Sequence, residues 1–301
     1  MDEMNLFSNE KKNNLIHYEG VLGVFDYDPR EFEIKKFGDG TECLHYCGKG
    51  SSVDLPDGCI NTSYMFSYCG LPKGFSLGEH FDTSNVIDMS SMFECCEISE
   101  GFSLGEHFDT SNVTSMEHMF SQCKLPEDLS LGEHFDTSKV TDMSDMFSYC
   151  SLSYGFSLGE HFDTSKVTNM RRMFGDCRLP EGFSLGAHFY TSNVTDMSFM
   201  FSECKLPEGF SLGEHFAIDR GTDVLRMFVN CKYKGVDAYD YFETQDAEEI
   251  ITKLRKYKKS EDIVVDNELT ALMLSVSEEL QLSTSIVQRM MKSYLKSLIN
   301  K

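Results

Sequence analysis

The sequence is poor in basic residues and has no long apolar run. Its 301 residues include 27 Lys and Arg against 49 Asp and Glu, so the formal net charge is −22. Since affinity for nucleic acid comes from Lys and Arg that displace counterions, we expect no direct binding to nucleic acid and instead a protein partner with a basic surface. No segment approaches the roughly 18 consecutive apolar residues of a membrane-spanning helix, which argues against a membrane partner.

The N-terminus also lacks the features of an export signal. Residues 1–7 begin acidic, and no apolar segment of the signal-peptide type follows them. We therefore expect a cytoplasmic protein. With 41% hydrophobic and 12% aromatic residues, the chain has enough apolar surface to fold around a core.

A repeat of 27 residues organises most of the chain. The dipeptide Met-Phe recurs at that interval, and a Cys stands three positions after each Phe. The dipeptides are Met65-Phe66, Met92-Phe93, Met119-Phe120, Met146-Phe147, Met173-Phe174, Met200-Phe201 and Met227-Phe228. A unit of this length is too short to be a domain, so the units must stack to bury their apolar side chains.

The apolar spacing within a unit predicts one short helix and one short strand. Met89, Met92, Phe93 and Cys96 fall at i, i+3, i+4 and i+7, which is one face of a two-turn helix. Residues 102–104 alternate between apolar and polar, which is typical of a very short strand. We therefore predict an α/β repeat solenoid of the leucine-rich-repeat type, in which the units bury a continuous column of Met, Phe, Leu and Val.

The ends of the chain differ from the repeat. Residues 1–53 include a strand-like apolar run and are predicted to form a small β-rich N-terminal cap. Residues 54–231 hold the repeat solenoid, whose first unit is truncated and whose last is degraded, as expected where stacking stops. Residues 232–301 are predicted to be a C-terminal helical region, with helical periods at 247–257 and 269–299.

The last predicted helix carries a broad apolar face beside Arg289, Lys292 and Lys296. Three interpretations of this face stay open. It could pack against the last repeat, form a homodimer through the C-terminal helices, or belong to a DNA-binding helix-turn-helix at residues 277–291.

The wording of the repeat is similar to that of a known family. Segments 110–114 (TSNVT), 140–147 (VTDMSDMF) and 194–201 (VTDMSFMF) resemble the repeat of the BspA-like leucine-rich-repeat surface proteins, including the mycoplasma lipoprotein-associated repeats. The resemblance covers about residues 55–231. It implies a non-catalytic solenoid used in recognition, and many members of that family are exported, adhesin-like proteins.

Most of the negative charge lies in the repeats. Residues 54–231 hold 10 basic and 27 acidic residues, a balance of 10 − 27 = −17. Two acidic rows recur with the repeat, and we predict that they bind the partner. They consist of Glu79, Glu106, Glu133, Glu160 and Glu214, and of Asp82, Asp109, Asp136 and Asp163. In the alternative interpretation, the Glu side chains point into solvent and the Asp side chains cap turns.

No pattern indicates catalysis, a cofactor or a metal. Gly-Phe-Ser-Leu-Gly matches the nucleophile elbow of hydrolases, but it occurs in five units, whereas an active site occurs once. A His that recurs beside the Glu row supplies parallel rather than convergent ligands. Cys43, His45, Cys47 and Cys59 form a loosely spaced cluster, for which zinc binding is left open. We therefore predict a protein that is not an enzyme.

The leading functional hypothesis is an acidic repeat protein that binds a macromolecular partner through its solenoid surface. One alternative is an inhibitor that mimics nucleic acid and occupies the basic cleft of a nucleic-acid-processing enzyme, because a row of carboxylates imitates a row of phosphates. The other alternative is the adhesin-like surface protein that the resemblance implies. Residues that differ between repeats, such as His118, Arg171, Arg172 and Phe199, lie on the predicted helix side and are candidates for tuning specificity.

Overall fold

The computed structural model describes residues 14–127, 129–208, 210–213, 215–218, 222–233 and 236–237. The described chain falls into two compact units. The first unit comprises the described residues up to Ala217 together with Thr222–Cys231. The second comprises Ile218 and the described residues from Lys232 onward. In the second unit β9 (Lys232–Tyr233) pairs antiparallel with β10 (Val236–Asp237). The predicted helices at 247–257 and 269–299, and with them the homodimer interface, lie outside the described residues.

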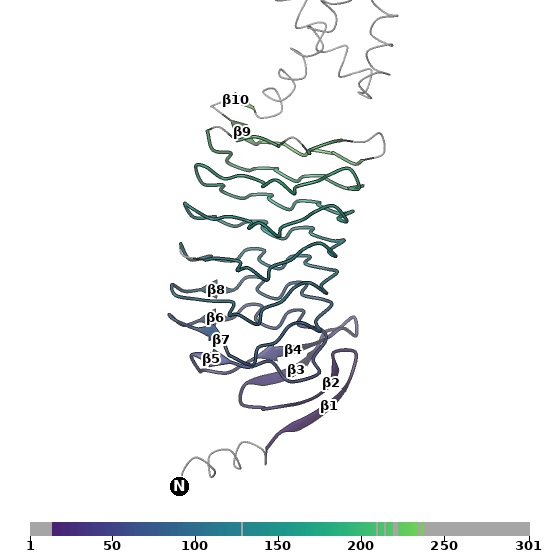
Figure 1. Ribbon diagram of the computed structural model, residues 1–301, viewed down its shortest axis with the longest axis vertical. Helices are drawn as coiled ribbons and strands as arrows, with labels where there is room; N and C mark the ends of the chain where they lie inside the picture. Colours follow the sequence, from purple (N-terminus) through teal and green to yellow (C-terminus); the bar gives the residue numbers. More distant parts are fainter. Residues whose placement is uncertain are drawn as a thin grey trace, which may run out of the picture. The chain divides into compact units, whose positions relative to one another are not determined.

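Two antiparallel hairpins begin the first unit (Figure 1). The first joins β1 (Ile16–Gly20) to β2 (Gly23–Tyr27), and the second joins β3 (Phe32–Lys36) to β4 (Glu42–Tyr46). Alternating side chains of β2 are buried, as expected for a strand with one face on the core. The hairpins join the repeats through the backbone, because the Tyr46 N–H donates to the Met65 carbonyl at 2.8 Å.

The repeats form a stack of layers, one layer for each 27 residues (Figure 1). Short parallel pairs connect the first layers: β5 (Ser52–Val53) with β7 (Ser76–Leu77), and β6 (Gly70–Leu71) with β8 (Glu97–Ile98). Single parallel bridges continue the same register upward, as in Asp88↔Ser115 and Ser115↔Asp142. Each layer therefore presents its equivalent residues directly above those of the layer before.

The predicted α/β repeat solenoid of short helices and strands is wrong, because the described part of the chain contains no helix and its strand pairs are only two to five residues long. The segment Met89–Cys96 is instead a succession of turns. Met92 N–H donates to the Met89 carbonyl at 3.2 Å and Cys96 N–H to the Phe93 carbonyl at 3.0 Å. These are i to i+3 bonds, whereas an α-helix makes i to i+4 bonds. The leucine-rich-repeat assignment is therefore also wrong, because it rested on the predicted helices.

A left-handed backbone explains why no helix forms. Ser91 and Cys95 have φ values of 55° and 53°, and equivalent residues in every described layer share this conformation. A left-handed residue at every fourth position interrupts a right-handed helix. The N–H groups of Ser91, Phe93 and Cys95 point out of the layer and donate to the next layer's carbonyls at 2.7 to 2.9 Å. The turns thus bond to their neighbours at every second residue, like strands of a parallel sheet.

The same turns still bury the residues that the sequence assigned to a core. Met89, Met92 and Phe93 are fully buried, and this prediction is confirmed. Their equivalents form continuous columns, the clearest being Phe66, Phe93, Phe120, Phe147, Phe174, Phe201 and Phe228. Successive rings of this phenylalanine column are stacked with centroids 5.3 to 5.7 Å apart and interplanar angles of 2 to 7°. Offset stacking of this kind adds to the free energy of apolar burial.

Buried threonines tie the layers together from inside. Thr137, which is fully buried, donates its hydroxyl to the Asp163 carbonyl of the next layer at 2.8 Å. Thr83, Thr110, Thr164 and Thr191 make the equivalent bond. A buried hydroxyl is stabilising only when its hydrogen bond is made, so this column favours one register of stacking. No helix of membrane-spanning length and hydrophobicity occurs in the described part.

Candidate functional site

The predicted glutamate row lies on the surface of the stack. Glu79, Glu106, Glu133 and Glu160 are all exposed, and none of these four takes part in an ion pair. Glu214, the fifth predicted member, lies outside the described residues. Because bridges such as Ser76↔Ser103 set adjacent layers in parallel register, neighbouring glutamates are separated by about one strand spacing, roughly 4.8 Å. The row is thus a line of unpaired carboxylates in solvent.

The predicted aspartate row has a structural task. Asp82, Asp109, Asp136 and Asp163 each accept the backbone N–H of the Ser two residues later, at 2.7 to 2.9 Å. This is the Asx turn of the alternative interpretation. At Asp82 the bonds from the Ser84 backbone and hydroxyl lower the carboxyl pKa, so the group stays ionised at neutral pH. The aspartates add charge beside the glutamate row, but one oxygen of each already accepts the backbone hydrogen bond of a turn.

A second side of the stack carries side chains that differ between layers, all exposed or half-buried except the buried Ser91. These are the two left-handed residues of each turn segment, four positions apart, with φ between 51 and 60°. In chain order the pairs are Tyr64 and Tyr68, Ser91 and Cys95, His118 and Gln122, Asp145 and Tyr149, Arg172 and Asp176, Phe199 and Glu203, and Arg226 and Asn230. We call this surface the turn face. The sequence had singled out three of its residues only because they vary; nothing in it indicated a left-handed backbone.

A connected cluster of charged and aromatic side chains occupies the middle of the turn face. The Arg172 guanidinium lies over the Tyr149 ring, 4.7 Å from its centroid, and donates to the Tyr149 hydroxyl. It also pairs with Asp176 at 2.7 Å and lies 3.7 Å from Asp145. Burial raises the pKa of Asp145, although nearby His118 and Arg172 act in the opposite direction. Arg172 therefore contacts one ring and two carboxylates of the protein itself, although its buried Nε–H has no hydrogen-bond partner among the described residues.

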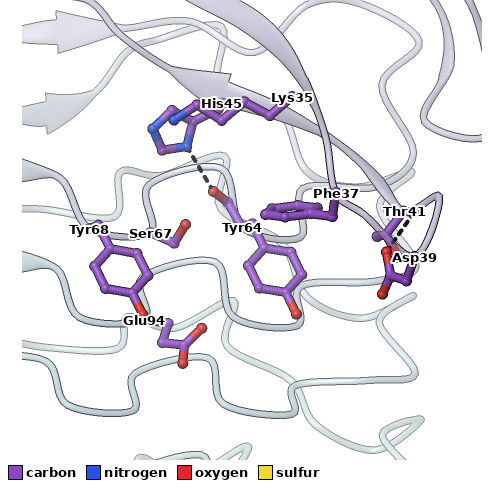
Figure 2. Close-up of a pocket in the computed structure, with 9 residues that line it drawn as sticks. All are labelled: Lys35, Phe37, Asp39, Thr41, His45, Tyr64, Ser67, Tyr68 and Glu94. Carbon is purple, nitrogen blue, oxygen red and sulfur yellow. Dashed lines mark hydrogen bonds between the residues drawn. The ribbon is translucent and has the colours of Figure 1, made fainter.

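A pocket opens at the end of the turn face nearest the hairpins (Figure 2). Its volume is about 600 Å³, and it lies between the β3–β4 hairpin and the turns of the first two layers. Phe37, Tyr64 and Tyr68 supply aromatic surface, and the Phe37 and Tyr64 ring centroids are 5.2 Å apart. Glu94 is drawn between the two tyrosines in Figure 2, on the side of their hydroxyl groups. Sequence reasoning missed this site, because its walls come from segments whose contact no periodicity reveals.

The serines of the repeated Gly-Phe-Ser-Leu-Gly motif are turn residues. Ser103 accepts the Gly105 N–H on its hydroxyl oxygen at 3.1 Å, and the bond recurs at Ser157, Ser184 and Ser211. Gly105 has a φ of 81°, which a side chain would disfavour. From Ser103 onward the motif therefore spans a tight turn, whereas in the first copy the Gly78 N–H donates to the Val53 carbonyl instead.

The cysteines and histidines do not converge on a metal. Cys59 donates to the Asn61 carbonyl at 3.2 Å, His45 contacts the Tyr64 carbonyl at 3.2 Å, and Cys47 is exposed. Across the described ranges, no group of three or more His, Cys, Asp and Glu residues is close enough to hold an ion. Burial raises the pKa of the Cys150 thiol to about 12, which is typical of a core cysteine that stays protonated.

Comparison with known proteins gives one family. The family model described as "Mycoplasma protein of unknown function, DUF285" matches residues 60–178 and, in a second match, residues 157–263. The two matches overlap and together cover more than half of the 301-residue chain. No curated protein and no solved structure matches it.

Proposed function

The chain belongs to this Mycoplasma family of unknown function, and we propose from its own geometry that it is a non-enzymatic recognition protein that binds a protein partner with a basic surface. The family is related to the BspA-like repeat proteins. The adhesin-like role implied by that relationship, and the cytoplasmic location expected from the sequence, stay predictions.

The unpaired glutamate row is the observation that carries the proposal. Two like charges held at one strand spacing, about 4.8 Å, in water would repel by roughly 0.9 kcal/mol before screening, and Glu79, Glu106, Glu133 and Glu160 recur in successive layers with exposed side chains. A row of partner Lys or Arg side chains removes this repulsion and replaces it with attraction. Binding should therefore be fast at low salt and weaken as the Debye length falls.

The regular recurrence of the same row supports a second candidate, an inhibitor that mimics nucleic acid. A cleft that holds phosphates at regular intervals would also accept carboxylates at regular intervals. The two candidates differ in the identity of the partner. A nucleic-acid-processing enzyme among the captured proteins supports the mimic, whereas other basic proteins support general recognition.

Changing the four described glutamates of the row to Gln is expected to reduce capture of basic proteins from cell extract about tenfold or more at about 0.1 M salt. The measurement is a pull-down with quantitative mass spectrometry at about 0.1 and about 0.5 M salt. The charge-matched control changes Glu100, Glu127, Glu181 and Glu208 to Gln, because this removes the same charge from exposed residues at another repeat position, where Tyr154 interrupts the series and Glu100 pairs with Lys73. Capture that both variants retain at high salt would contradict the proposal.

A further inference from the structure

The pocket of Figure 2 combines aromatic walls with carboxylates. Tyr68 is 75% exposed, and Phe37 is 41% exposed. Both rings, with Tyr64, thus present π surface to whatever enters the pocket. Aromatic faces attract cations, and the planar guanidinium of Arg stacks on them best.

The charges at the pocket also favour a cation. Asp39 and Glu94 are carboxylates of the lining, and the bond from the Thr41 backbone N–H lowers the pKa of Asp39, which keeps it ionised. Burial lowers the pKa of His45, so that ring is neutral at pH 7. Lys35 is the cation of the lining, and its ammonium lies 3.4 Å from the Glu33 carboxylate. Negative charge therefore exceeds positive charge around the opening.

In the middle of the stack, an arginine of the protein itself covers the tyrosine ring that corresponds to Tyr68. Tyr68 stands three layers, or 81 residues, before Tyr149, and Ser91 stands the same distance before Arg172. At the later position Arg172 covers the Tyr149 ring, and Tyr149 is 50% exposed. At the earlier position the equivalent residue is the short, buried Ser91, and the Tyr68 ring is 75% exposed while its hydroxyl interacts with the Cys95 side chain. The position that corresponds to Asp176 holds Cys95, and the carboxylate beside Tyr68 comes instead from the preceding residue, Glu94.

We propose that the Tyr68 pocket binds an arginine side chain of a basic protein segment, which takes the place that Arg172 fills three layers further on. The inference rests on the proposed function and names the contact that makes binding selective for arginine. The guanidinium stacks on Tyr68 and pairs with Glu94, while the carboxylate row attracts the remaining positive charge of the segment. Lysine fits less well, because its ammonium cannot stack as a plane.

The probe is a fluorescein-labelled decapeptide of alternating Gly and Arg, titrated by fluorescence anisotropy against the full chain. A peptide with Gln in place of Arg shows the contribution of charge and shape. A peptide with Lys in place of Arg shows the contribution of the planar guanidinium. We expect the Arg peptide to bind at least about threefold more tightly than the Lys peptide, because only the guanidinium stacks on Tyr68.

The decisive variant is Ser91→Arg, which should cover Tyr68 from within the protein. Ser91 has a φ of 55° and Arg172 a φ of 51°, so the backbone at this position already holds an arginine elsewhere in the stack. We expect the Kd of the Arg peptide to rise about tenfold or more. Gln122→Arg is the charge control, since it adds the same charge to the turn face at an exposed left-handed residue that does not line the pocket, whereas Ser91 itself is buried. That variant should change the Kd less than about threefold.

A second variant needs no new side chain. Glu94→Gln removes the pocket carboxylate and is expected to raise the Kd of the Arg peptide about three- to tenfold, whereas Glu181→Gln on another surface should not. Equal effects of Ser91→Arg and Gln122→Arg on the Kd, or no effect of Glu94→Gln, would contradict arginine binding in the pocket. If changing the glutamate row to Gln still weakens binding of the Arg peptide in that case, the proposed function stands and only the pocket proposal is wrong. If the Arg peptide binds to neither the pocket nor the glutamate row, the result counts against both proposals.

Discussion

Removing the Phe147 ring should lower the free energy of unfolding by about 3–5 kcal/mol, the range measured for large core side chains. Phe147 is fully buried and stacks on Phe120 and Phe174, each with ring centroids 5.7 Å apart. It also meets Phe156 edge to face at 5.8 Å. Phe147→Ala therefore opens a cavity between three rings.

Urea unfolding followed by circular dichroism measures this loss, because the sequence has no Trp to report it by fluorescence. Phe147→Leu is the control, since it keeps an apolar side chain and should lose clearly less. A loss below about 1 kcal/mol for Phe147→Ala would mean that the phenylalanine column is not a continuous packed core.

Deleting half a layer should abolish cooperative folding, whereas deleting a whole layer should not. Removal of residues 115–141 joins Thr114 to Asp142 and restores the Val-Thr-Asp-Met wording of the repeat. Removal of residues 115–127 instead takes away one turn segment and leaves its neighbours without partners. The four N–H groups of residues 89, 91, 93 and 95 and the four carbonyls of residues 142, 144, 146 and 148 lose their bonds.

These eight backbone hydrogen bonds contribute about 8 kcal/mol at about 1 kcal/mol each, and the Phe120 ring is lost with them. That sum is comparable to the whole stability of a typical domain. Urea titration of both deletion variants tests the expectation. A whole-layer variant without a cooperative transition would contradict a stack of equivalent layers, and so would a half-layer variant that unfolds like the intact chain.

The sequence predicted which residues are buried better than it predicted their backbone. Two successive turns place residues i, i+3, i+4 and i+7 on one side just as a helix does, so the spacing of Met89, Met92, Phe93 and Cys96 could not separate the two. Gly or Asn at every fourth position would have indicated a left-handed backbone. Here those positions hold Tyr, Ser, His, Arg and Phe among others, because bonds between layers impose the conformation.

The candidate site was predictable in part for a similar reason. A row such as Glu79 and Glu106 follows from the repeat alone, since equivalent residues of stacked units must lie in line. The Asx turns of the aspartates were foreseen as an alternative because Asp before Thr-Ser favours them. The Tyr68 pocket was not foreseen, because it depends on how the β3–β4 hairpin sits against the first layers.

The left-handed backbone of the turn face is the feature on which the exposed variable side chains and the Ser91→Arg design depend. Comparing Gln122→Gly with Gln122→Ala tests this backbone conformation, because it determines which of the two variants has the larger free energy of unfolding. Gln122 is exposed with a φ of 56°, so the Gly variant should be more stable than the Ala variant by about 1 kcal/mol in urea unfolding. In a helix Ala would instead be the more stable by about 1 kcal/mol, and that result would contradict the turn face.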